Sequence, residues 1–199
     1  MTYKTILVHV DNGKYCPARL NMAIHVARRF DAHLVGLHAL TAVRLPAYAI
    51  AEAGATLLEA QRTVAKEQAD RAESLFKSAI AGAGLASTEW RVSSDDAVDA
   101  LTLHARYADV VVLGQPRERD SSGVESDFPE RVILAAGRPV LMVPYAGKFE
   151  RLGKRVLVAW NTGREATRAV TDSIPLLREA EQVHVVVFNP EGTAHGAVP

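Results

Sequence analysis

Short apolar runs that alternate with amphipathic stretches constrain this chain more than any other feature of its sequence. Runs rich in Val, Ile and Leu occur at 5–10, 33–40, 108–114 and 139–144. A shorter run with strand character occurs at 88–92. The run at 5–10 is apolar on both faces, as a strand must be when helices cover both sides of a sheet. Stretches with helical spacing separate these runs. The alternation predicts an α/β fold with a doubly wound, five-stranded parallel sheet.

The longest helical stretch, about 56–81, has no internal Gly or Pro and ends at Gly82-Ala-Gly84. Its charged residues indicate a solvated surface helix. Residues 41–55 carry Pro46 and Gly54 and are expected to form a loop, with room for a short helix. The next helix is expected to begin at a cap supplied by Ser94 or Asp95.

The beginning of the chain recurs 150 residues later. Lys4–Gly13 aligns with Lys154–Gly163, and the alignment continues without a gap to Val35 and Val185. This internal repeat predicts a first module at 1–145, a linker at 146–153 and an incomplete second module at 154–199. A β-α-β unit alone buries too little apolar surface to be stable. We therefore expect the second module to pack against the first or against another chain.

Charge and hydropathy exclude several classes of partner. Lys and Arg number 23, as do Asp and Glu, so the chain has no basic field that would hold nucleic acid or an anionic membrane. No uncharged apolar run approaches the ~18 residues that a membrane helix needs. The N-terminal residues match a first strand better than a signal peptide, and the single cysteine, Cys16, forms no internal disulfide. We expect a cytoplasmic protein.

The order of the segments, together with the repeat, resembles the universal stress protein family, and within it the tandem subclass with an incomplete second module. The matching segments are 4–11, 108–114, 138–144 and 155–163. The resemblance implies an adenine nucleotide alpha hydrolase-like sheet in the order 3-2-1-4-5. It also implies a ligand crevice at the carboxyl ends of strands 1 and 4, where many members hold ATP. A doubly wound sheet places ligands at the same point.

Positions that match the family's nucleotide site are Val10, Asp11, Ala39, Leu113, Gly114, Arg117, Ser126 and Asp127. The family's phosphate loop has the pattern Gly-x2-Gly-x9-Gly-Ser/Thr. Here Arg117 stands at the second Gly, and either Asp127-Phe128 or, counted back from the helix, Ser126-Asp127 stands at the last pair. The loop glycines are missing and a carboxylate lies near the phosphate position, where it repels phosphate. The sequence therefore predicts weak ATP binding or none.

Other residues allow two interpretations. Cys16, in the first turn of a helix, is either a thiol with a lowered pKa or a small packing residue. His9 and His38, on adjacent strands, either form a metal pair or are ordinary sheet histidines. Ser121 and Ser122 either accept a phosphate or belong to a polar loop tip.

No motif indicates an enzyme. The adjacent Asp95-Asp96 pair lies where helix caps are common, and the sequence has no Gly-x-Ser-x-Gly elbow or Walker loop. We expect a non-catalytic stress-response protein that forms a homodimer through an apolar edge strand at 138–144 and also contacts an unidentified protein partner. An ATP-binding switch and a weak ATPase remain the alternatives.

Overall fold

The computed structural model describes residues 2–40, 47–117, 125–147, 149 and 152–188, with backbone only for 47–56. The chain forms two compact units, one of residues 3–148 and the other of residues 149–199 with residues 1–2.

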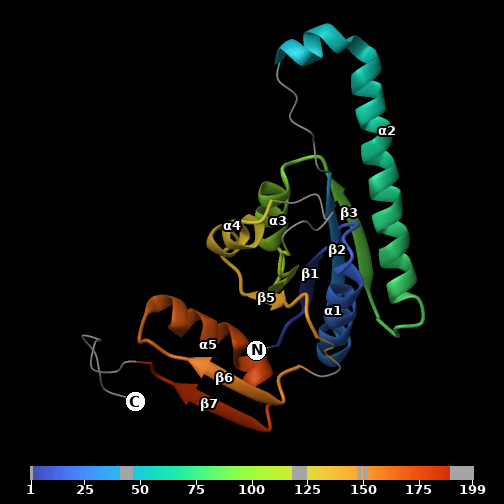
Figure 1. The fold of residues 1–199 in the computed structure, drawn as a ribbon. Coiled ribbons are helices and arrows are strands. Elements are labelled where there is room, and N and C mark those ends of the chain that lie inside the picture. Colours follow the sequence, from blue (N-terminus) through green and yellow to red (C-terminus); the bar gives the residue numbers. More distant parts are fainter. Residues whose placement is uncertain (1, 41–46, 118–124, 148, 150–151, 189–199) are drawn as a thin grey trace. The chain divides into compact units, whose positions relative to one another are not determined.

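The larger unit contains a five-stranded sheet. Its strands, in chain order, are β1 (Thr5–His9), β2 (His33–Ala39), β3 (Thr88–Ser93), β4 (Val110–Gly114) and β5 (Val140–Val143). All neighbouring pairs are parallel, and the spatial order is β3-β2-β1-β4-β5 (Figure 1). The predicted doubly wound parallel sheet is confirmed. The strand order reverses direction between β1 and β4, so the connections that leave these two strands diverge there.

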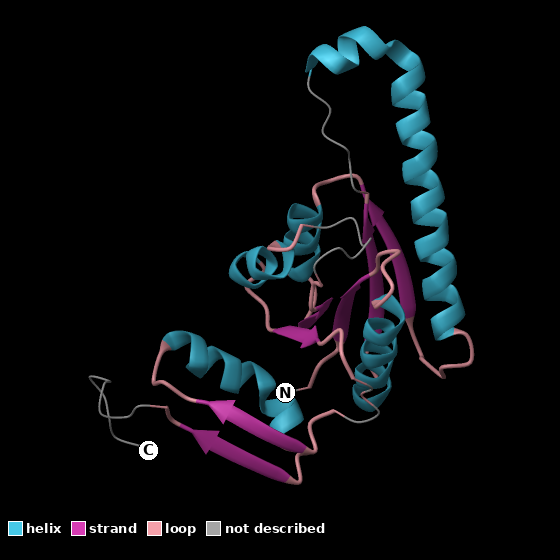
Figure 2. Ribbon diagram, viewed as in Figure 1, coloured by secondary structure: helices cyan, strands magenta, loops and turns pink. Residues whose placement is uncertain are grey.

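Helices cover both faces of this sheet. They are α1 (Cys16–Phe30), α2 (Ala47–Ile80), α3 (Ala97–Ala105) and α4 (Phe128–Ala135). Figure 2 shows α1 and α2 on one face and α3 and α4 on the other. Leu7, Val35 and Val111 pack with the buried residues of α3 and α4 in one core cluster. On the opposite face, Phe76 of α2 lies against Gly36.

Two boundaries differ from the sequence expectation. Helix α2 begins at Ala47, so residues 47–55 are helical and the expected loop is wrong there. Gly54 lies inside the helix, where one glycine costs only about 1 kcal/mol relative to alanine, which neighbouring turns can offset.

The cap of α3 is Asp96, whose carboxylate accepts a hydrogen bond from the N–H of Val98 at 3.0 Å. Neither Ser94 nor Asp95 fills this role.

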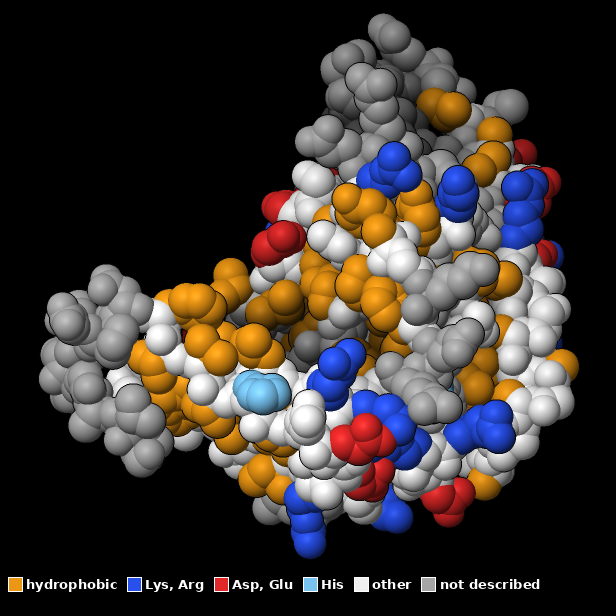
Figure 3. Space-filling model, turned by 60° about the horizontal axis from the view of Figure 1, so that its bottom comes forward, with side chains coloured by type: hydrophobic (Ala, Val, Ile, Leu, Met, Phe, Trp, Pro, Cys, Tyr) orange, Lys and Arg blue, Asp and Glu red, His pale blue; other side chains and the backbone are white. Residues whose placement is uncertain are grey.

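The smaller unit consists of β6 (Arg155–Ala159), α5 (Arg164–Leu177) and β7 (Gln182–Val186), with β6 and β7 parallel. Among its described residues only Pro175 is buried. Hydrophobic side chains gather on its surface (Figure 3), including Leu157, Val185 and Phe188. Such exposure is expected for a unit too small to enclose a core.

The repeat is visible in the local geometry, with one correction. The N–H of Gly13 donates to Oδ1 of Asp11 at 2.9 Å, and the N–H of Gly163 donates to Oδ1 of Asn161 at 2.9 Å. However, Arg155 pairs with Gln182, whereas Thr5 pairs with His33. Corresponding residues of the two units are therefore 150 apart at β6 but 149 apart at β7. The ungapped alignment to Val185 is wrong by one residue.

Candidate functional site

Four predicted residues meet at the carboxyl ends of the central strands. Val10 follows β1, and its N–H donates to the carbonyl of Leu37 at 2.8 Å. Ala39 ends β2, while Leu113 and Gly114 end β4. These ends lie side by side because β1 pairs with both β2 and β4.

Asp11, the next residue, forms a buried ion pair. Its side chain accepts the Gly13 N–H through Oδ1, and its Oδ2 lies 2.9 Å from Nη2 of Arg19. Asp11 is 4% exposed and Arg19 is 5% exposed. Burial is the largest single influence and raises the pKa of Asp11. The charge of Arg19, the neighbouring His9 and the hydrogen bonds from Arg19 and Gly13 together outweigh it, so this carboxyl has a pKa below its ordinary value. Asp11 is therefore held as a carboxylate by the chain itself.

Arg19 is a site residue that the sequence reasoning missed. It projects from the buried side of α1, among Leu20 and Ala23. Its Nη1 lies 2.5 Å from the point that a Cβ at position 114 would occupy, so any larger residue there would force the guanidinium to shift. Its Nε is buried and has no hydrogen-bond partner within the described part of the chain. A charged residue within the apolar stripe of a helix was the signal that could have revealed it.

We call Val10, Asp11, Arg19 and Gly114 the carboxyl-end site. His9 lies beneath it, with Nδ1 3.7 Å from Oδ2 of Asp11 and its ring centroid 4.9 Å from that of Phe128. His9 is 2% exposed. Burial lowers the pKa of His9 to about 3, so the imidazole is neutral near pH 7.

His38 lies on the opposite face of the sheet from His9. His9 pairs with Leu37 in the β1–β2 register, so the side chain of the next residue, His38, points the other way. Nδ1 of His38 donates to the carbonyl of Val10 at 2.8 Å, and its ring stacks on that of Trp90. The metal-pair interpretation is wrong for these two histidines.

Cys16 is a packing residue. It is 1% exposed at the start of α1, and burial raises the pKa of its thiol. The interpretation as a thiol with a lowered pKa is wrong, because a helix N-terminus does not offset the loss of water around a thiolate here.

Arg117 lies at the edge of the carboxyl-end site, on the loop after β4. Its Nη1 donates to the hydroxyl of Tyr15 at 2.6 Å, and its guanidinium lies 5.6 Å from the ring centroid of Tyr145. Tyr15 precedes α1 and Tyr145 follows β5, and their rings are 5.9 Å apart. Arg117 therefore links the loops that follow β1, β4 and β5.

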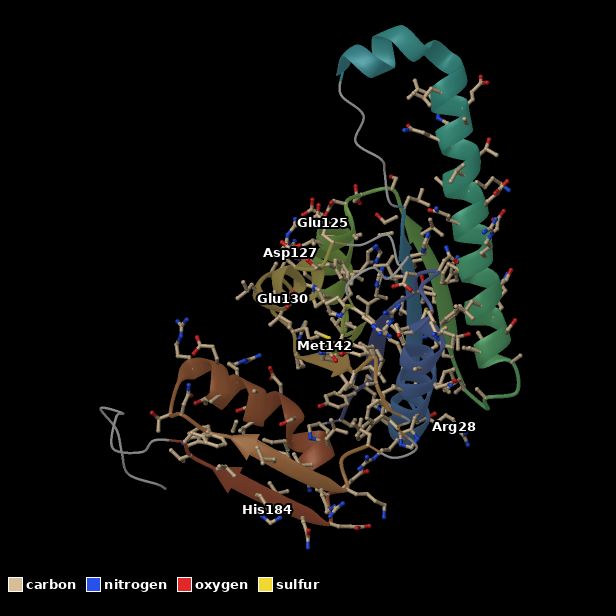
Figure 4. All side chains as sticks on the ribbon, in the orientation of Figure 1. Arg28, Glu125, Asp127, Glu130, Met142 and His184 are labelled. Atoms are coloured by element: carbon tan, nitrogen blue, oxygen red, sulfur yellow. The ribbon has the colours of Figure 1, made fainter. Side chains whose placement is uncertain are left out.

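Ser126 and Asp127 are exposed residues that precede α4. Asp127 occupies the N-cap position, but its side chain makes no capping hydrogen bond to the described residues. Figure 4 shows Asp127 near Glu125 and Glu130 at this end of α4, and Glu125 pairs with Arg131 at 3.1 Å. The beginning of α4 is thus acidic, which opposes the attraction of a helix N-terminus for phosphate.

The structure does not bring all predicted residues together. Within the described ranges, no hydrogen bond or ion pair joins Ser126 or Asp127 to Asp11 or Arg19. Ser121 and Ser122 lie outside the described residues, so their prediction stays untested. Across the described residues, no group of three potential ligands could hold a metal ion, and no helix is long and apolar enough to span a bilayer.

Comparison with known proteins gives a consistent family. The model of the universal stress protein family matches residues 2–144. No curated protein matches the sequence. Among solved structures, UspA from Lactobacillus plantarum is 22% identical, with a TM-score of 0.57, over 72% of this chain and 99% of its own.

Two structures from Archaeoglobus fulgidus are also similar. A universal stress protein from strain DSM 4304 is 16% identical, with a TM-score of 0.69, over 96% of this chain and 67% of its own. Another, solved in complex with dAMP, is 22% identical over 71% of this chain and 98% of its own, with a TM-score of 0.44. The structure from strain DSM 4304 supports the fold alone. The TM-score of the dAMP complex is too low for its ligand to be placed on this chain.

Proposed function

Because the chain belongs to the universal stress protein family, we propose that it acts in the stress response by binding and without catalysis. A second copy pairs with it through the edge of β5, and adenine nucleotide binds weakly at the carboxyl-end site. The chain further represents a tandem member of the family with an incomplete second module. The turn shared by Asp11 and Asn161 supports this, as does a fold likeness over 96% of the chain, which extends into the smaller unit.

The open backbone edge of β5 is the observation that carries the proposal. β5 is the last strand of its sheet. The carbonyl of Pro139 accepts a hydrogen bond from Val111 of β4 at 3.0 Å, and that of Val143 accepts one from Gln115, which follows β4, at 2.8 Å. Alternate residues of a strand point their N–H and C=O groups to the same side, so those of Val140 and Met142 face away from β4.

The sequence of β5 makes this edge suited to strand pairing. All four of its residues, Val-Leu-Met-Val, are apolar, and an edge strand without charges is a ready template for another strand. Antiparallel pairing of two β5 strands would join two sheets across a twofold axis.

A proline at Met142 tests the dimer. Met142→Pro removes an N–H that faces away from β4, and so it blocks strand addition while the β4–β5 hydrogen bonds remain. Met142→Ala is the matched control because it loses the same side-chain packing but keeps the N–H. Figure 4 marks this residue on β5.

By sedimentation velocity we expect the wild type and Met142→Ala to be dimers and Met142→Pro to be a monomer. Far-UV circular dichroism must show that all three are folded. A monomeric wild type, or a folded Met142→Pro that remains dimeric, would contradict the pairing through β5.

Weak nucleotide binding is supported by three features of the described residues. Asp11 is already engaged by Arg19, the helix that would receive phosphate begins with carboxylates, and Arg117 stands where the family has a loop glycine. Calorimetric titration of the full chain with ATP and Mg²⁺ tests this. We expect no strong binding and no phosphate release above background.

The two alternatives give different results in the same measurements. An ATP-binding switch would bind ATP tightly and lose that binding in Asp11→Ala. A weak ATPase would release phosphate. Either result would replace the proposal for this site, and neither would affect the dimer.

A further inference from the structure

Arg19 fills space at the point where the family's ligand crevice meets β4. Its Nη1 lies 2.5 Å from the position of a Cβ on Gly114. Glycine at this position would ordinarily let a ligand approach the backbone closely. Here the guanidinium of the chain's own α1 occupies that space.

The same guanidinium neutralises the carboxylate that a ligand would meet. Nη2 of Arg19 lies 2.9 Å from Oδ2 of Asp11, and both side chains are almost fully buried. An incoming nucleotide would have to separate two opposite charges that water scarcely reaches, and such a separation is costly.

The fold itself does not require these charges. The smaller unit has Asn161 and Ala169 at the positions that correspond to Asp11 and Arg19. Its strand, turn and helix nevertheless follow the same course, with the same hydrogen bond from Gly163 to Asn161. In the larger unit, moreover, burial leaves Nε of Arg19 without a partner in the described residues, which costs stability.

We propose that Arg19 is an internal occupant of the nucleotide site and the residue that sets its low affinity for adenine nucleotides. The side chain takes the space beside Gly114 and keeps Asp11 paired. This inference rests on the weak nucleotide binding of the proposed function, and it assigns the largest part of that weakness to one side chain.

Removal of Arg19 should change ATP affinity in the direction opposite to the one that charge attraction alone would give. Removal of a cation should weaken the binding of an anion such as ATP, yet removal of Arg19 should strengthen it because space opens beside Gly114 and Asp11 is released. Arg28→Ala is the matched control, since it removes the same charge from an exposed position of the same helix, outside the site. It should leave ATP affinity unchanged or lower it.

The experiment measures ATP and adenosine binding to the full chain by calorimetry, for the wild type, Arg19→Ala, Arg19→Met and Arg28→Ala. We expect Arg19→Ala to bind ATP at least about tenfold more tightly than the wild type. Arg19→Met keeps most of the side-chain volume and should gain less. Adenosine should also bind Arg19→Ala more tightly than the wild type, because the gain comes from the space beside Gly114 and not from a contact with phosphate.

A double variant keeps the test valid if Arg19→Ala alone does not fold. Arg19→Ala leaves Asp11 buried without its partner, whereas Asp11→Asn combined with Arg19→Ala reproduces the neutral pair of the smaller unit. We expect this double variant to fold and to bind ATP more tightly than the wild type.

If both variants are folded and bind ATP no better than the wild type, the inference about Arg19 is wrong while weak nucleotide binding stands. An equal gain in Arg28→Ala would also overturn it. Tight ATP binding by the wild type would instead refute the proposed function.

Discussion

Acid should destabilise the larger unit through His9 before it protonates Asp11. The pKa of His9 is about 3 in the fold, against 6.5 for the exposed side chain. Between these values the unfolded chain carries one more proton than the folded chain, so stability falls as the pH falls. Each pH unit in this window costs about 1.4 kcal/mol, or about 3 kcal/mol from pH 6.5 to about pH 4.5. That is a large share of the ~5–15 kcal/mol typical of a domain.

The groups around His9 do not reverse this sign. Burial lowers the pKa of His9 most, the charge of Asp11 opposes it, and Arg19 and His38 lower it further. Asp11 itself has a lowered pKa, so its contribution to stability is lost progressively as the pH falls from the ordinary pKa of aspartate to that lowered value. Over the window considered, Asp11 remains a carboxylate in both states and adds little slope.

The assay is urea unfolding from about pH 7.5 to about pH 4.5, with Trp160→Phe as the common background so that Trp90 reports on the larger unit. His9→Leu removes the titrating ring and keeps an apolar side chain against Phe128. As the pH falls, the free energy of unfolding of His9→Leu should decrease less steeply than that of the wild type. We expect the two slopes to differ by about 1.4 kcal/mol per pH unit.

His184→Gln is the control, because His184 is an exposed residue of β7 and its loss should leave the slope unchanged. Parallel pH profiles for the wild type and His9→Leu would refute the reasoning. So would an NMR titration in which the His9 ring becomes protonated near pH 6.

Three further predictions concern the fold around the site. Gly36→Ala would place a Cβ 2.7 Å from the ring of Phe76, so we expect a loss of about 1–3 kcal/mol in urea unfolding, partly restored by adding Phe76→Leu. Asp96→Ala removes the cap of α3 and should cost about 1 kcal/mol; an unchanged melting temperature would contradict this. Asp109→Ala removes a carboxylate that accepts two backbone N–H groups at the start of β1, at 2.7 and 2.9 Å, and should cost about 2 kcal/mol. Hydrogen exchange of those two amides should then accelerate, and Asp109→Asn, which keeps an acceptor, should show a smaller effect.

The errors in the expected boundaries have a common cause. Gly54 suggested a loop, but a long helix tolerates one glycine, and Pro46 precedes Ala47, where proline is compatible with a helix start. The one-residue shift at β7 arises between Gly163 and Gln182, a stretch whose length the apolar spacing does not specify. Local patterns identify an element more reliably than its ends.

The sequence by itself determined the parallel α/β sheet and the place of the carboxyl-end site, since apolar periodicity and turn residues act over a few neighbouring positions. It also located Asp11 and the neutral counterpart Asn161. The packing of separate elements was needed to show that Arg19 pairs with Asp11, that His9 and His38 face opposite sides, and that the Cys16 thiol is buried with a raised pKa. Each of those outcomes depends on distance and burial between side chains from separate elements, and the free energy of a charge is set by those two quantities and not by its position along the chain.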